Sequence, residues 1–174
     1  MNKMIVIYTI LALLVLSGCA QDNRDMRTIK GIDKSVQKYV TMYETIKGKQ
    51  IGDIPIGLSN LNGATAGVCY RWSNGYRQIL IDREYWESKY TTENERINVV
   101  FHELGHCDLN RGHLESYRSN GLPSSLMFPY NLGFSDYDAD YYYKELFGRV
   151  KSQSKVSDLE TSDSSGGDCV RDMQ

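Results

Sequence analysis

Residues 102–113 read HELGHCDLNRGH and contain all three histidines of the 174-residue chain. The first five of these residues fit the pattern H-E-x-x-H. On an α-helix, His102 and His106 project from one face, about 40° apart in azimuth and about 6 Å apart along the axis. Both imidazoles can therefore reach one metal ion, with Glu103 beside them to act on a bound water. The stretch predicts a zinc site carried by a helix.

A catalytic zinc ion usually has three protein ligands, and the third histidine, His113, is the first candidate for that place. If the helix continued to His113, that side chain would lie about 10 Å beyond His106 along the axis. We therefore expect the helix to end between the two, at Asn110 or Gly112, because both residue types tolerate a positive φ. Two acidic residues are alternative third ligands: Glu115 and Asp108.

The segments before the motif predict a sheet and the start of the helix. Thr92-Glu93-Asn94-Glu95 fits a capping box, so the metal-site helix should begin there. The β-prone runs 67–72 and 76–82 flank Ser73-Asn74-Gly75, which predicts a β-hairpin. Residues 51–58 are typical of a strand, and residues 59–64 of a loop.

Two further helices are predicted at the ends of the folded region. Apolar residues recur at helical spacing from Ile29 to Ile46, and Gly48 should end that helix. Residues 135–147 predict a second helix, stopped by Gly148. The expected fold class is α+β: a small mixed sheet with an edge hairpin, an N-terminal helix, an active-site helix and a C-terminal helix.

The N-terminal residues are typical of an export signal. Lys3 and the apolar run 4–16 precede Leu16-Ser17-Gly18-Cys19, which resembles the bacterial lipoprotein signal. That resemblance implies a lipidated Cys19 that anchors the chain to the cell envelope, on the outer membrane if the source is Gram-negative. An uncleaved anchor and an ordinary signal peptide are the alternatives. The expected organisation is a signal peptide (1–18), a tether (19–27), a folded domain that carries the zinc site (28–150) and a mobile tail (151–174).

The charge of the chain bears on nucleic-acid binding, and its cysteines bear on disulfide formation. The chain carries 20 basic and 22 acidic residues, a net charge of -2, so nothing favours nucleic-acid binding. Export permits disulfides. Of the three cysteines other than Cys19, Cys69 and Cys107 are the preferred pair because both are expected in the core. Cys169 is left over in the tail.

The histidine spacing resembles that of the metzincin clan of zinc peptidases, H-E-x-x-H-x-x-G-x-x-H followed by a Met-containing turn. This chain departs from the pattern: Leu109 stands where the family has glycine, and His113 comes one residue late. The stretch 125–130, SLMFPY, resembles the Met-turn of matrix metalloproteinases, and its Met127 comes 14 residues after His113. The resemblance implies a zincin-like fold.

The same resemblance assigns roles to further residues. Met127 would pack beneath the three imidazoles, although an ordinary core methionine is the alternative. Tyr130 would help to stabilise the reacting oxyanion, although an ordinary packed tyrosine fits equally well. The strand at Ala66–Tyr70 would be the sheet edge that pairs with substrate. The residues expected at that edge are Ala66, Gly67 and Val68.

These observations predict a zinc-dependent endopeptidase that hydrolyses peptides or proteins with one catalytic Zn²⁺. Glu103 would take a proton from the zinc-bound water and deliver it to the leaving amine. Two other classes stay open: a non-catalytic zinc-binding envelope lipoprotein, and an adhesion or scaffold protein with the tyrosine-rich segment 137–143 as its contact surface. For that segment an amphipathic helix is the simpler interpretation.

Overall fold

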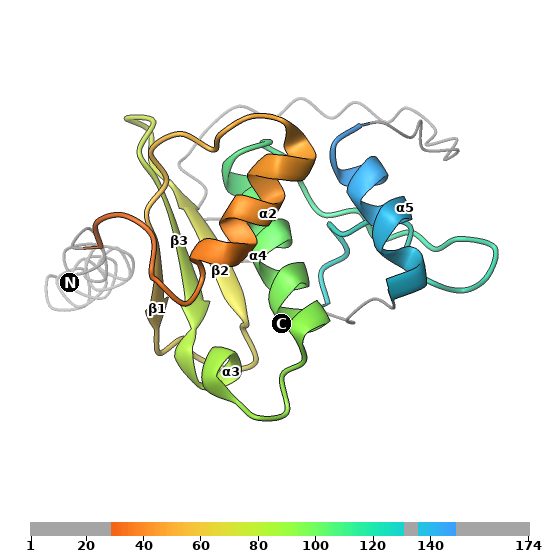
Figure 1. Ribbon diagram of the computed structural model, residues 1–174, viewed down its shortest axis with the longest axis horizontal. Coiled ribbons are helices and arrows are strands. Elements are labelled where there is room, and N and C mark those ends of the chain that lie inside the picture. Colours follow the sequence, from red (N-terminus) through yellow and green to blue (C-terminus); the bar gives the residue numbers. More distant parts are fainter. Residues whose placement is uncertain (1–28, 131–135, 149–174) are drawn as a thin grey trace, which may run out of the picture. The chain divides into compact units, whose positions relative to one another are not determined.

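The computed structural model describes residues 29–130 and 136–148 (Figure 1). The chain divides into two units, Met1–Lys30 and Gly31–Gln174, and nearly all described residues belong to the second. Among the described helices, none has the length and apolar character needed to cross a membrane. The predictions that lie outside the described residues are the signal peptide, the tether, the tail, Cys19 and Cys169.

The sheet has three strands, β1 (Ile56–Ser59), β2 (Gly67–Arg71) and β3 (Arg77–Asp82), in the order β1-β3-β2. β3 pairs in parallel with β1 and antiparallel with β2, so the predicted mixed sheet and hairpin are confirmed. The side chain of Asn74 accepts a hydrogen bond from the Tyr76 N–H and closes the turn. β2 is therefore an edge strand of this sheet.

The helix predicted from Ile29 to Ile46 is wrong in its first eight residues. Helix α2 spans Gln37–Lys47 and ends at Gly48, where φ is 78° as expected. Gly31, also at positive φ, breaks the periodic pattern, and Ile32 instead forms a parallel bridge with Ile56. The predicted strand at 51–58 is likewise regular only from Ile56 onward.

Helix α4 (Glu93–Cys107) carries the motif, and Thr92 and Glu95 form the predicted capping box. Before it comes a short helix that the sequence did not suggest, α3 (Arg83–Glu87), whose first turn is capped by the Asp82 side chain. Figure 1 shows α2 and α4 on one side of the sheet. Every residue of α4 from Ile97 to Cys107 is buried, so the motif lies inside the protein.

Helix α5 (Asp136–Leu146) follows the predicted C-terminal helix to within a residue at each end, and Gly148 has a φ of 69°. Tyr142 is only 4% exposed, and its hydroxyl donates to the Pro123 carbonyl. The Tyr141 hydroxyl likewise donates to the Ser124 carbonyl. These two tyrosines pack the helix against the preceding segment, which argues against a contact surface built on them.

One buried cluster joins the sheet to the helices. Ile79 and Ile81 of β3 face α2 and α4, and Tyr43 packs edge-on against Phe101 at 5.1 Å. A disulfide joins Cys69 of β2 to Cys107, the last residue of α4, which confirms the preferred pairing. Within the described residues the architecture is thus mixed α and β, with a three-stranded sheet and four helices.

Candidate metal centre

The two histidines of α4 lie in its most buried turn. His102 is 0% exposed and His106 is 3% exposed. Each ring donates through Nδ1–H to a backbone carbonyl, His102 to Leu126 at 2.8 Å and His106 to Arg111 at 2.7 Å. Because a carbonyl oxygen can only accept, these bonds place the proton on Nδ1 and leave Nε2 bare in the neutral rings. Both rings therefore turn an unprotonated Nε2 inward.

The chain reverses directly after α4, as the spacing of the histidines required. Asn110 has a φ of 55°, the one non-glycine residue at positive φ in the described part of the chain. Of the two residues expected to make this reversal, Asn110 makes it and Gly112 has no positive φ. The Arg111 N–H donates to the Gly105 carbonyl at 3.0 Å and folds the chain back along the helix.

The reversal brings His113 to the other two rings. Its Nε2 lies 3.2 Å from the Nε2 of His102 and 3.2 Å from that of His106, and those two atoms are 2.9 Å apart. His102, His106 and His113 are the one group in the described chain whose side chains could together hold a metal ion. The prediction that His113 joins the pair is therefore confirmed in its geometry.

The donor set fits zinc. Nitrogens bound at about 2.0–2.1 Å in tetrahedral geometry lie about 3.3 Å from one another, close to the three spacings here. Two bare Nε2 lone pairs face each other at 2.9 Å, an arrangement that a cation between the rings stabilises. Burial, followed by the positive charges that His106 and His113 can carry, lowers the pKa of His102 to about 3. His102 is thus neutral at pH 7 and ready to bind a metal.

Glu103 lies beside this cluster in a tight cradle. The residue is 0% exposed, and both carboxylate oxygens are buried. A Cβ added at Gly67 of β2 would come within 2.8 Å of the Glu103 Cγ and 2.9 Å of its Oε1. The edge strand therefore runs directly against the carboxylate, and only glycine fits at this point of the strand. Nothing in the sequence pointed to this requirement.

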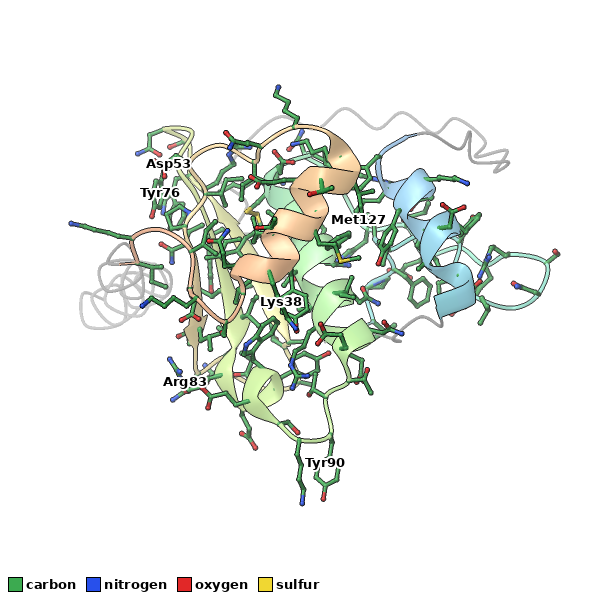
Figure 2. All side chains as sticks on the ribbon, in the orientation of Figure 1. Lys38, Asp53, Tyr76, Arg83, Tyr90 and Met127 are labelled. Carbon is green, nitrogen blue, oxygen red and sulfur yellow. A yellow bond between two sulfur atoms is a disulfide. The ribbon has the colours of Figure 1, made fainter. Side chains whose placement is uncertain are left out.

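Met127 packs against the same helix at Gly105. The side chain is 0% exposed, and its Sδ lies 2.3 Å from the position that a Cβ on Gly105 would take. Its carbonyl accepts a hydrogen bond from the Leu114 N–H, next to His113. Figure 2 shows Met127 between α4 and α5. Met127 therefore packs on Gly105 of the ligand-bearing helix, whereas its predicted place beneath the three imidazoles stays a prediction.

The other candidate residues lie elsewhere. The Asp108 carboxylate pairs with Lys47 and accepts from the Tyr43 hydroxyl at 3.0 Å, so it faces α2 rather than the histidines. Glu115 is exposed and outside the histidine cluster. Tyr130 is 55% exposed with its ring 5.9 Å from that of Phe128, and its role at an oxyanion stays a prediction. Of the edge residues, Ala66 and Val68 flank Gly67 and are buried.

Comparisons with known proteins identify no relative of this chain. No protein-family model matches the chain, and neither a curated protein nor a solved structure matches it. The chemistry of the site is therefore inferred from its own residues.

Proposed function

We propose that the chain is a zinc-dependent endopeptidase of metzincin-like design. The observation that carries this proposal is the convergence of three imidazole Nε2 atoms to within 3.2 Å of one another, with Glu103 between two of the ligands in sequence. A structural zinc site usually has four protein ligands, whereas three leave a position for water or substrate. The three-histidine set is therefore better suited to catalysis than to structure.

The three imidazoles would bind the zinc ion, and Glu103 would act as the general base and then the general acid. Zinc bound there supplies Lewis-acid chemistry, which acidifies water and polarises a carbonyl group. The Glu103 carboxylate accepts a proton from the attacking water and returns it to the amine of the departing peptide. The hydrogen bonds from His102 and His106 to backbone carbonyls keep both rings in the tautomer that binds metal.

The edge strand supports a peptide as the substrate class. β2 has β3 on one side only, and its Gly67 lies against Glu103. A peptide in extended conformation that added a strand to this edge would carry its backbone past the carboxylate. The Cys69–Cys107 disulfide links this strand to the end of α4. This link keeps the strand and the ligand-bearing helix in one register.

The cellular location in this proposal comes from the sequence. Cys19 and the signal before it predict lipid attachment in the bacterial envelope. The peptidase domain would then act at a membrane surface without inserting into it.

The test is cleavage of a diverse peptide library by the purified, zinc-loaded chain, with new termini read by mass spectrometry. Glu103→Gln removes the proton acceptor, while Glu115→Gln is the matched control at an exposed position close to His113. We expect cleavage by the parent and by E115Q, and a loss of at least 100-fold in E103Q with zinc still bound. Equal cleavage by the parent and E103Q would remove the proposal.

One observation favours the alternative, a non-catalytic zinc-binding envelope lipoprotein. Glu103 is fully buried, so water and substrate reach its carboxylate only if the neighbouring strand moves. Zinc binding in both parent and E103Q, with no cleavage by either, would decide for this alternative.

A further inference from the structure

The carbonyls that orient the two helix histidines come from separate stretches of chain. The Arg111 carbonyl accepts from His106, and the Leu126 carbonyl accepts from His102. Neither stretch is regular secondary structure in the described chain. The orientation of the rings therefore depends on whatever holds these two stretches in place.

One side chain contacts both stretches. Glu145, near the C-terminal end of α5, forms an ion pair with Arg111 through Oε1. Its Oε2 accepts a hydrogen bond from the Ser125 hydroxyl at 2.8 Å, and the same hydroxyl accepts from the Met127 N–H at 2.9 Å. Ser125 immediately precedes Leu126. The Glu145 carboxylate thus bridges the residue that provides one carbonyl and the neighbour of the residue that provides the other.

Because the Glu145 carboxylate is buried, this bridge restricts the movement of the residues that it joins. Glu145 is 5% exposed, so its charge is stable inside the protein only while both oxygens keep their partners. Arg111 also donates to the carbonyls of Glu145 and Leu146, at 3.2 Å and 3.0 Å, where α5 ends. A guanidinium that makes several hydrogen bonds in a fixed fork has little freedom to move. These contacts of its side chain also restrict the Arg111 backbone, whose carbonyl accepts from His106.

We propose that Glu145 is a positioning residue of the metal centre, acting through Arg111 and Ser125 on the carbonyls that orient His106 and His102. This inference rests on the metal binding assumed in the proposed function, but not on peptidase activity. It assigns to α5 a role at the site although the histidine cluster contains no residue of this helix.

The test compares Glu145→Gln with Asp138→Asn in the purified full chain. Asp138 is the matched control. It also lies on α5, and it forms an ion pair with Arg118, which lies between Arg111 and Ser125 in the sequence. That pair reaches neither carbonyl-bearing residue. Affinity for Co²⁺ is measured by titration and affinity for Zn²⁺ by chelator competition. The cobalt absorption spectrum reports ligand geometry, and urea unfolding in chelator reports stability without metal.

We expect E145Q to weaken metal binding about 10- to 100-fold and to alter the cobalt spectrum. We expect D138N to stay within about 3-fold of the parent, whatever its stability. Equal affinities for parent and E145Q would overturn the inference alone. So would equal weakening by E145Q and D138N, because that would reduce Glu145 to a general stabilising role. A parent chain that binds no metal would overturn the proposed function as well.

A second variant keeps the test decisive if E145Q does not fold. Ser125→Ala removes one arm of the bridge and leaves the Arg111–Glu145 ion pair intact. We expect a smaller loss of affinity, with a cobalt spectrum displaced in the same direction. In the metal-free chain, the Nδ1–H proton of His102 should exchange faster in S125A than in the parent, as measured by NMR. Unchanged exchange together with unchanged affinity would overturn the proposal.

Discussion

Helix α4 and the segment that follows it, residues 108–130, supply the metal ligands in different ways. α4 presents His102 and His106 through one turn of regular backbone, with a capping box at its start. The segment presents His113 without regular structure, held by separate contacts such as the Leu114 N–H to the Met127 carbonyl at 2.9 Å. The backbone positions of two ligands thus depend on local hydrogen bonding within the helix, whereas the position of the third depends on packing between distant residues.

The largest effect is expected just before the segment begins, at the disulfide that ties Cys107, the last residue of α4, to Cys69 of β2. Replacing Cys69 and Cys107 by alanine opens a loop with a sequence separation of 38 residues. Chain entropy alone predicts a loss of about 4 kcal/mol in the free energy of unfolding. Urea unfolding of the metal-free chain measures it, and the reduced parent chain should match the double variant. A loss below about 1 kcal/mol would mean that the end of α4 is held on β2 without the bridge.

The next effect concerns the contact between the regions at Gly105. A Cβ there would lie 2.3 Å from the Met127 Sδ, so Gly105→Ala forces α4 and the segment apart. We expect a cost of about 1–3 kcal/mol and weaker metal binding. Gly112→Ala is the control, because a Cβ at Gly112 meets nothing within 4 Å. If both variants behave alike in unfolding and metal titration, the packing of Met127 on α4 is unimportant.

A cap variant tests α4 by itself. The Thr92 hydroxyl accepts a hydrogen bond from the Glu95 N–H at 3.3 Å, and the Glu95 carboxylate accepts one from the Thr92 N–H at 2.6 Å. Thr92→Ala should cost about 1 kcal/mol, since one end of the helix loses its cap. Hydrogen exchange should accelerate in the first turn while metal affinity stays unchanged. Weaker metal binding would show that the two ends of α4 are coupled.

The smallest effect is expected at the reversal in the segment. Asn110 has a φ of 55°, and its side chain accepts from Arg71. Asn110→Ala and Asn110→Gly both lose that bond, so their difference isolates the backbone conformation. Alanine should be less stable than glycine by about 0.5–1 kcal/mol and should bind metal more weakly. Equal values for the two variants would mean that the reversal adapts to the residue it contains.

The sequence predictions succeeded where a feature is encoded locally and failed where it depends on a distant partner. The hairpin around Asn74, the capping box at Thr92 and the helix end at Gly48 were all predictable, because each is encoded within a few residues. The overlong helix beginning at Ile29 failed because its periodic pattern competes with a partner far along the chain, Ile56. A pattern of apolar residues does not reveal such a partner.

Local sequence was enough to predict that His102, Glu103 and His106 share one helical turn, and that the chain must reverse before His113 can join them. Helical geometry and the φ preferences of single residues are local properties, so neighbouring residues suffice to encode them. The contact of Gly67 with Glu103, and the link that Glu145 makes between Arg111 and Ser125, are formed only in the folded chain. Those contacts join residues 20 to 36 positions apart, and packing rather than local preference brings them together.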